Sequence, residues 1–578
     1  MIKPRIPLLE RLTQRRTPLT ATTSDLRRCL SVFDLVNSGF SSMVGAGIFV
    51  ITPVLTANTT GPAVTLSYLV AGLATLISAL TYAELAGRFQ GIGSSYFYVY
   101  CVLGELAASI IGISTLIESM IGLASVVKSL SIYSDQLLFN GTIIAWEQRT
   151  LPLHMDYMTD YVDLYGLLIL CICGALNMWG VKQTVVVSAL CNVVVVVSLV
   201  VLVVVGFVKG SFSNWFDAVP PEGVAGGTGG YLPYGWSGVF TGASLAYFSY
   251  NGFDTCASLG CEARNPQKDI PTSIVISFSG VMGLYVLVCG AITYMAPYYT
   301  LGNEAGLALA FASVPWVKYT ISAGAVLATA TGSFASVLVT SRIMFSMAQD
   351  GILFKGLTYV SPGHIPLVSI LVSMVLPALG ILLLNIEELV MMNSGGLLIC
   401  FCLTNICVVV GRYQPQYPNP RGTYSHSEQY SLLFCLLFWF CSLAANLCFL
   451  TGGFTLFGAL SGGAFSVVAA ITLLLIYCAF SEIEKGTTFR CPWVPLLPGL
   501  GIFINSSLMV SLPLMTWVRV GCCLLVGLLF YLSYGLLYSN ITVEKQNLLR
   551  SVELDSSDRE GSSPENFSES EKLIGHQY

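Results

Sequence analysis

Two apolar stretches of the chain contain glycine clusters that could expose the peptide backbone to a ligand. The first carries Gly39, Gly45 and Gly47, and the second carries Asn251 and Gly252. Glycine costs a helix about 1 kcal/mol relative to alanine, so each cluster predicts a break in a helix. Amides freed by the first break would open a new half-helix whose positive end suits a carboxylate, and carbonyls freed by the second would suit an ammonium.

The two breaks together predict a zwitterion site of the kind that an α-amino acid would fill. Its backbone donors and acceptors would come from Val44, Gly45, Ala46, Gly47 and Ile48 in the first stretch and from Ser249, Tyr250, Asn251 and Gly252 in the second. The alternative is that small residues merely let helices pack closely, as is common in membranes. The clusters lie five predicted spans apart, and paired glycine-interrupted segments at equivalent positions favour a transporter binding site.

Glu118 is the acidic residue placed deepest in an apolar stretch, with small and apolar neighbours. A charge at the centre of a membrane helix costs about 2.5 kcal/mol or more, so such a residue is a functional candidate. It would face the substrate path and either pair with a cationic side chain or take up a proton. The alternative is a structural hydrogen bond. Glu84 lies nearer a span end, and we expect it to pair with a cytosolic arginine such as Arg88.

Composition places these residues in a membrane. Charged residues make up 10% of the 578 and apolar residues 54%, with a mean hydropathy of +0.75. A water-soluble protein would have too few polar residues to cover so much apolar surface. No nucleophile elbow, phosphate loop or metal cluster stands where water could reach it, and the 18 cysteines fall mostly in apolar runs, where they act as small apolar side chains. The sequence therefore predicts neither an enzyme, a cofactor, a metal site nor a nucleic-acid partner.

Fourteen segments have about the 20 mostly apolar residues that a helix needs to cross about 30 Å of hydrocarbon. They lie near 33–56, 62–86, 98–127, 163–180, 184–207, 237–259, 272–295, 316–341, 365–384, 388–410, 430–450, 454–480, 493–512 and 517–538. Each must satisfy its backbone polar groups internally, which in lipid means a helix. The sequence predicts an all-α integral membrane protein.

The basic residues orient these spans. With the amino terminus inside, only Lys128, Arg149, Lys209, Lys318 and Arg519 fall on the outer side, and the other 21 of the 26 Lys and Arg residues are cytosolic. This positive-inside bias predicts that both termini are cytosolic. The outer loop 129–161 carries the glycosylation sequon at Asn140.

The acidic, Ser-rich segment after residue 540 is predicted to be a disordered cytosolic tail. It contains two strings that resemble acidic dileucine sorting signals, formed by Glu544, Leu548 and Leu549 and by Glu569, Leu573 and Ile574. They make an endolysosomal membrane an alternative to the plasma membrane.

Several ordered motifs resemble the cationic amino acid transporters of the amino acid–polyamine–organocation superfamily. They are residues 42–50, Tyr82–Arg88 with Gly93–Tyr96, Asn251–Asp254 with Glu262–Pro271, and Ser341–Gly351. The resemblance covers roughly residues 25–540.

The resemblance implies alternating access and a core of five plus five inverted-repeat helices. The expected organisation is a cytosolic tail (1–31), a ten-span core (32–411), four additional spans (412–540) and the carboxyl tail (541–578). It also implies an ion site between spans one and eight, for which Thr329, Thr331 and Ser333 are candidates, although such hydroxyls often bond to their own helix.

The chain departs from its relatives in places. A lysine that bacterial relatives carry in the fifth span has no counterpart in the stretch 193–201, where Val195 is the equivalent, and Cys261 precedes Glu262 where the family often has two glutamates. One branch of the family has twelve spans and a cysteine between spans three and four that links it to a glycoprotein heavy chain. This chain has fourteen predicted spans and no cysteine in the loop 129–161, so a disulfide-linked heavy chain is not expected. A homo-oligomer stays open.

The sequence leaves three functions open. The first is transport of amino acids, cationic ones by resemblance (arginine, lysine or ornithine). The second is transport of neutral amino acids or GABA-like amines, and the third is amino acid sensing without transport. The partners expected in each case are an amino acid and the lipid bilayer.

Overall fold

Helices form almost all of the structure. The computed structural model describes residue 15 and residues 30–89, 93–153, 159–179, 181–221, 227–259, 262–302, 306–361, 365–412, 426–452, 456–479 and 489–539. Within these ranges there are two isolated β-bridges, Leu30 with Ala263 and Pro152 with Tyr161, and no β-strand.

The helices of the first half are α2 (Val32–Met43), η1 (Gly47–Ile51), α3 (Thr52–Leu55), η2 (Thr56–Thr60), η3 (Gly61–Ala63), α4 (Val64–Arg88), α5 (Ser95–Leu103), α6 (Glu105–Leu138), α7 (Thr142–Thr150), α8 (Leu164–Asn177), α9 (Val181–Lys209), α10 (Ser213–Phe216), α11 (Gly235–Ala246), η4 (Tyr247–Tyr250), α12 (Asp254–Ser258) and α13 (Pro266–Met295). Those of the second half are η6 (Tyr298–Thr300), α14 (Gly306–Leu309), α15 (Pro315–Gln349), η7 (Lys355–Thr358), α16 (Leu367–Ser373), α17 (Val375–Leu383), α18 (Ile386–Arg412), α19 (His426–Gly452), α20 (Leu456–Ala479), α21 (Leu496–Ser511), α22 (Leu514–Phe530), η8 (Tyr531–Gly535) and α23 (Leu536–Tyr538).

Among the described residues, nine helical stretches are long and apolar enough to cross a membrane, and one of them, Val32–Arg88, contains the first two predicted spans. Three further apolar helices are shorter, namely Leu164–Asn177, Leu367–Leu383 and Leu496–Ser511. Each of the fourteen predicted segments falls on helix. The membrane character is thus confirmed, and the count of fourteen crossings stays a prediction.

The third predicted span differs from the structure in its boundaries. The chain turns at Gly104, whose φ of +91° suits glycine and separates α5 from α6. The crossing helix α6 therefore begins at Glu105 and not near residue 98. At 1.5 Å per residue its 34 residues extend roughly 50 Å, which is longer than the about 30 Å of hydrocarbon that a span must cross.

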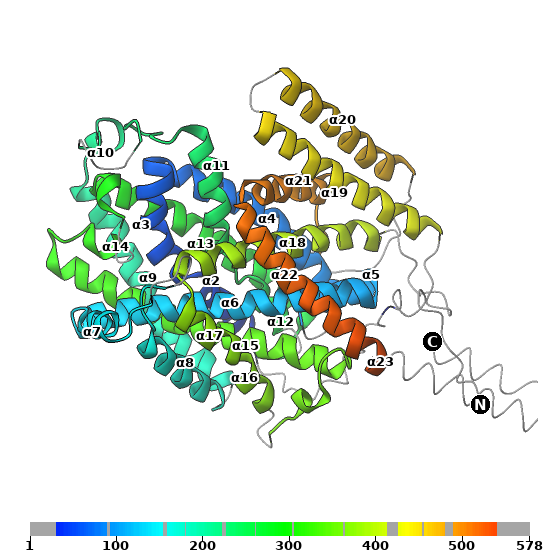
Figure 1. Cartoon of the computed structure of the whole chain (residues 1–578), viewed down its shortest axis with the longest axis horizontal. Coiled ribbons are helices and arrows are strands. Elements are labelled where there is room, and N and C mark those ends of the chain that lie inside the picture. Colours follow the sequence, from blue (N-terminus) through cyan, green and yellow to red (C-terminus); the bar gives the residue numbers. More distant parts are fainter. Residues whose placement is uncertain are drawn as a thin grey trace, which may run out of the picture.

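The long helices pack against one another and against α2, which belongs to the first predicted break (Figure 1). Helix α13 packs against α4, α2 and α9, while α6 packs against α15 and α18. Helices α19 and α20 lie side by side at the edge of the molecule, and α19 also packs against α21 and α18. Helix α22 contacts α6 and α18, α21 contacts α18 and α4, and α19 contacts α18, so at least three of the four predicted additional helices touch the predicted core directly.

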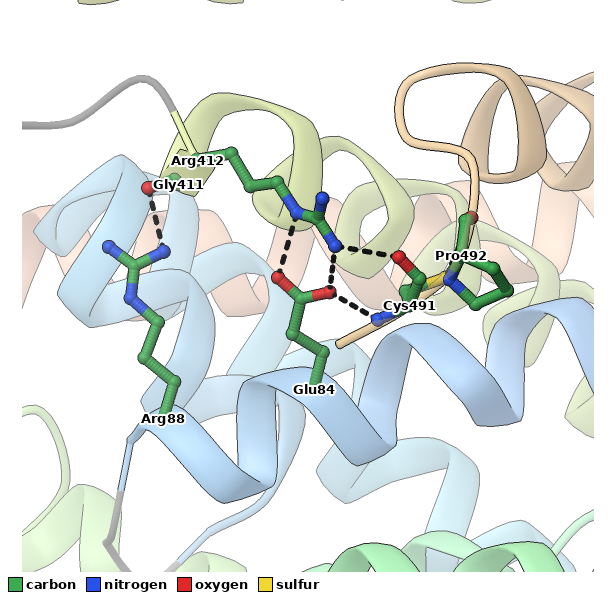
Figure 2. A network of polar contacts seen from close by, with 6 residues as sticks. All are labelled: Glu84, Arg88, Gly411, Arg412, Cys491 and Pro492. Atoms are coloured by element: carbon green, nitrogen blue, oxygen red, sulfur yellow. Dashed lines mark hydrogen bonds and ion pairs between the residues drawn. The ribbon is translucent and has the colours of Figure 1, made fainter. Parts of the chain in front are cut away.

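A buried ion pair joins α4, α18 and the chain that leads into α21 (Figure 2). The carboxylate of Glu84 accepts two hydrogen bonds from the guanidinium of Arg412, at 3.1 and 2.8 Å, and a third from the amide of Cys491 at 2.8 Å. Arg412 also donates to the Cys491 carbonyl at 2.7 Å. Both charges are thus hydrogen-bonded, which is the condition for a buried pair to be tolerated.

The predicted pairing of Glu84 with an arginine is confirmed, but the partner is Arg412 and not the example named, Arg88. Arg88, on the same helix, points instead to the end of α18 and donates to the carbonyl of Gly411 at 2.6 Å (Figure 2). Its guanidinium also lies over the ring of Phe89. Arg412 is 328 residues from Glu84, so local spacing could not have identified it.

Replacement of Arg412 by alanine should destabilise the protein strongly. It would leave the Glu84 carboxylate buried without its cation, a change that costs about 3–5 kcal/mol in comparable pairs. The matched control is Arg519→Ala, which removes the more exposed ion pair with Glu388 and should cost less than about 1 kcal/mol. Thermal unfolding of both variants in detergent measures the difference. Equal shifts in the unfolding temperature would contradict the role given to the Glu84 pair.

Candidate functional site

The first predicted break is present in the structure. Helix α2 ends at Met43, Val44 is extended (ψ 104°), and the helix resumes at Gly47. The Val44 amide still donates back to Phe40, at 2.8 Å, and the first amide to bond across the break is that of Phe49, to the Gly45 carbonyl at 3.3 Å. The four amides from Gly45 to Ile48 therefore open a half-helix, where amides have no carbonyl of their own helix to bind.

The second predicted break is also present. Helix α11 tightens into η4, Asn251 is extended (φ −66°, ψ 137°), and Gly252 has a φ of +123° before α12 begins. Only glycine adopts such a φ without strain. The Phe248 carbonyl accepts from the Asn251 amide at 3.0 Å. The carbonyls that follow it in η4 lie at the end of the helix, where carbonyls have no amide of their own helix to bind.

The broken helices cross in direct contact at two glycines. A Cβ added to Gly47 would lie 2.5 Å from the Cα, Cβ and Oγ of Ser249, and one added to Gly252 would lie 2.5 Å from the Cβ of Ser42. Such distances are prohibitive, so the crossing requires glycine at both positions. Gly45 is different, because the nearest atom to its Cβ would be the carbonyl oxygen of Ala328 at 4.0 Å. Space therefore remains beside the amides of the first break.

The remaining predicted backbone residues are buried. Val44, Ala46, Ile48 and Tyr250 are each at most 1% exposed. Their side chains pack among the helices, so the backbone is the part of these residues that a ligand could use.

Tyrosine hydroxyls from neighbouring helices satisfy the polar groups at the crossing. The hydroxyl of Tyr68, on α4, donates to the Gly47 carbonyl at 3.0 Å and hydrogen-bonds the hydroxyls of Ser249 at 2.9 Å and Thr52 at 2.6 Å. Tyr285 on α13 donates to the Met43 carbonyl at 2.7 Å, at the end of α2.

Tyr133 on α6 donates to the carbonyl of Phe49, also at 2.7 Å. Sequence reasoning missed all three tyrosines, because a tyrosine in an apolar run looks like an ordinary core residue.

Glu118 lies beside the second break. Its Oε1 is 3.5 Å from the side-chain amide of Asn251, and its main-chain carbonyl accepts from Asn393 of α18 at 2.9 Å. Asn251 also reaches the side-chain oxygen of Asn393, at 3.4 Å. The predicted acid and the predicted break are thus brought together. Asn393 was missed, although an amide in an apolar run was a usable signal.

The hydroxyls proposed for an ion site bond to their own helix. Thr329 donates to Ala325 at 2.7 Å, Thr331 to Ala328 at 3.0 Å, and Ser333 to Thr329 at 2.8 Å. Each hydroxyl oxygen can still accept or coordinate, and Ala328 does face the first break. The ion site therefore stays a prediction.

Asn192 is a further polar residue that sequence reasoning missed. From α9, the fifth span, its side-chain amide donates to the side chains of Asn37 and Ser41 on α2, at 2.7 Å each. Its side-chain oxygen lies 3.4 Å from the hydroxyl of Thr331 on α15. A neutral amide thus links three helices three residues before Val195, which is itself fully buried.

On the side predicted to be cytosolic, the broken spans are tied to each other and to α15. Leu30 pairs with the chain after the second break, donating to the Glu262 carbonyl and accepting from the Arg264 amide, both at 3.0 Å. The Glu262 carboxylate binds the guanidinium of Arg342 through two hydrogen bonds of 3.1 Å, and both side chains are buried. The predicted amino-terminal tail therefore joins the core at residue 30, two residues before the expected boundary.

Two peripheral predictions remain as they were. Asn140 is exposed in the turn between α6 and α7, and its glycosylation stays a prediction. The tail residues Glu544, Leu548, Leu549, Glu569, Leu573 and Ile574 lie outside the described residues.

Comparison with known proteins identifies the family of the chain. A family profile described as amino acid permease matches residues 30–476, and one described as the C-terminus of that permease matches residues 489–539. The chain is 30% identical to the mouse (Mus musculus) cationic amino acid transporter 4 over 601 residues, which cover 93% of this chain and 92% of that protein. It is also 30% identical to the Arabidopsis thaliana cationic amino acid transporter 3, mitochondrial, over 88% of this chain and 91% of the relative. The chain is a membrane transporter, not an enzyme, and it belongs to the amino acid permease family.

Proposed function

We propose that this chain carries cationic amino acids across a membrane by alternating access, with the substrate held between the broken first and sixth spans. The observation that carries the proposal is the crossing itself. It brings together the four amides from Gly45 to Ile48 and the carbonyl end of η4, within the predicted first and sixth spans. An α-carboxylate fits the amides and an α-ammonium fits the carbonyls, because helix ends carry opposite partial charges.

The proposal for a cationic side chain depends on Glu118. Its carboxylate is 5% exposed and lies beside Asn251, at the second break. A buried carboxylate next to the substrate backbone would favour a guanidinium or ammonium over an apolar side chain. The mouse and Arabidopsis relatives are named cationic amino acid transporters, which agrees with this choice.

The remaining features of the proposal are architectural. They are fourteen spans, a five-plus-five repeat in residues 32–411, and cytosolic termini. The proposed location is the plasma membrane, and the two dileucine-like strings favour an endolysosomal membrane as the alternative. Transport of neutral amino acids is the second candidate function, favoured by the absence of lysine from residues 193–201.

Uptake of radiolabelled arginine, leucine and GABA into proteoliposomes, with and without a pH gradient, tests the function. Accumulation of arginine above the other two substrates is the expected result. Accumulation of leucine or GABA alone would support the neutral transporter. If no substrate accumulates in vesicles that contain folded protein, transport is contradicted and a sensor is the better interpretation.

Gly45→Leu should abolish uptake while the protein still folds. The side chain would occupy the space in front of the first-break amides, where a Cβ meets only Ala328, at 4.0 Å. Gly280→Leu on α13 is the matched control, because Gly280 is exposed and no atom lies within 4 Å of its added Cβ. Uptake is measured after both variants give monodisperse protein. Normal uptake by Gly45→Leu would refute the carboxylate site.

Glu118→Gln should reduce arginine uptake about tenfold relative to leucine, since a charge-assisted hydrogen bond is lost while shape is kept. The control is Glu105→Gln, another buried carboxylate of α6, which accepts hydrogen bonds from Tyr100, Tyr531 and Ser539. That variant should leave the ratio of arginine to leucine uptake unchanged. Equal losses for both substrates in Glu118→Gln would show that Glu118 does not select the substrate charge.

A further inference from the structure

A small cavity lies beside Glu118 on the side that faces the last span. It lies between α6, α18 and α22, is partly open to the surface, and has a volume of about 20 Å³. Its lining includes Ser114 and Glu118 of α6, Met392 and Gly396 of α18, and Cys523 and Leu524 of α22. The cavity therefore joins the acid of the candidate substrate site to one of the four additional helices.

One oxygen of the Glu118 carboxylate lacks a protein partner. Oε1 reaches Asn251, whereas Oε2 is buried and has no hydrogen-bonding partner within the described part of the chain. Leaving a buried acceptor unsatisfied costs about 1–3 kcal/mol, and more when the group is charged. Since Glu118 lines the cavity, a donor located there could satisfy this oxygen.

The size and polarity of the cavity restrict that donor. A volume of roughly 10–15 Å³ accommodates one water, and a buried water needs two to four polar partners. Ser114 lies one helical turn before Glu118 on the same face of α6, so its hydroxyl and the carboxylate are both available to one molecule. Cys523 adds a thiol, a weak partner. A sterol ring would be too large.

We propose that this cavity binds one water molecule, which donates to Oε2 of Glu118 and is held by the hydroxyl of Ser114. Helix α22 forms one wall of the site through Val520, Cys523 and Leu524. The water lowers the cost of a carboxylate at membrane depth, because a bridging water is nearly as favourable as a direct hydrogen bond. Helix α22, in the last predicted span, thereby helps to stabilise the charge of Glu118 in the predicted ten-span core.

Pulsed X-ray radiolysis with mass spectrometry tests this site in lipid nanodiscs, since hydroxyl radicals formed from a bound water oxidise the side chains around it. Met392 and Cys523 should be oxidised in the unmodified protein. The neighbouring Cys522, which is exposed on α22 where lipid covers it, should stay unmodified. Leu524→Phe should fill the cavity and remove the oxidation of Met392 and Cys523. The matched control, Leu525→Phe, changes an exposed side chain next to it and should leave the oxidation unchanged.

Two results would overturn the proposal. One is an unmodified Met392 and Cys523 in the native protein, as expected if the cavity is dry or filled by an acyl chain. The other is equal oxidation in Leu524→Phe. If Leu524→Phe does not fold, Gly396→Ala replaces it, because its Cβ would lie 3.6 Å from Oε2 of Glu118 in an ordinary contact. Oxidation that persists in a folded Gly396→Ala protein would likewise contradict a water at this oxygen.

Discussion

The structure depends on holding two interrupted helices together where lipid offers no hydrogen bonds. A break in a membrane helix is tolerated only if other groups satisfy the backbone that it frees. Here Gly47 packs against Ser249 and Gly252 against Ser42, so the two interrupted helices are in direct contact. Tyrosine hydroxyls from α4, α6 and α13 then take up the carbonyls at the first break. The amides from Gly45 to Ile48 and the carbonyl end of η4 are the groups to which we propose that the substrate binds.

The surrounding polar contacts keep this crossing in place. Asn192 joins α9 to α2 and α15. The β-bridge between Leu30 and Ala263 ties the segment before α2 to the segment after α12, on the side predicted to be cytosolic. The buried pair of Glu84 and Arg412 fastens α4, which carries Tyr68, to α18 and to the chain before α21. The additional helices therefore contact the core through this pair, through the packing of α19 and α21 against α18, and through the packing of α22 beside Glu118.

The sequence was sufficient for features that are encoded locally. Glycine clusters located both breaks, apolar runs located the helices, and a lone carboxylate in an apolar run singled out Glu118, which the structure then places next to Asn251. Partners set by tertiary structure could not be found in this way. Arg412 is 328 residues from Glu84, and Ser249 is 181 residues from Tyr68, so no spacing rule connects them. The turn at Gly104 was missed because apolar composition continues across it, and only the positive φ ends α5.

The most direct test is a density map of the protein bound to arginine in a lipid nanodisc. We predict interrupted first and sixth spans, with the substrate carboxylate within hydrogen-bonding distance of the amides from Gly45 to Ile48. The α-ammonium should lie at the carbonyl end of η4. Continuous helices at these positions, or arginine bound away from the crossing, would contradict the proposed site.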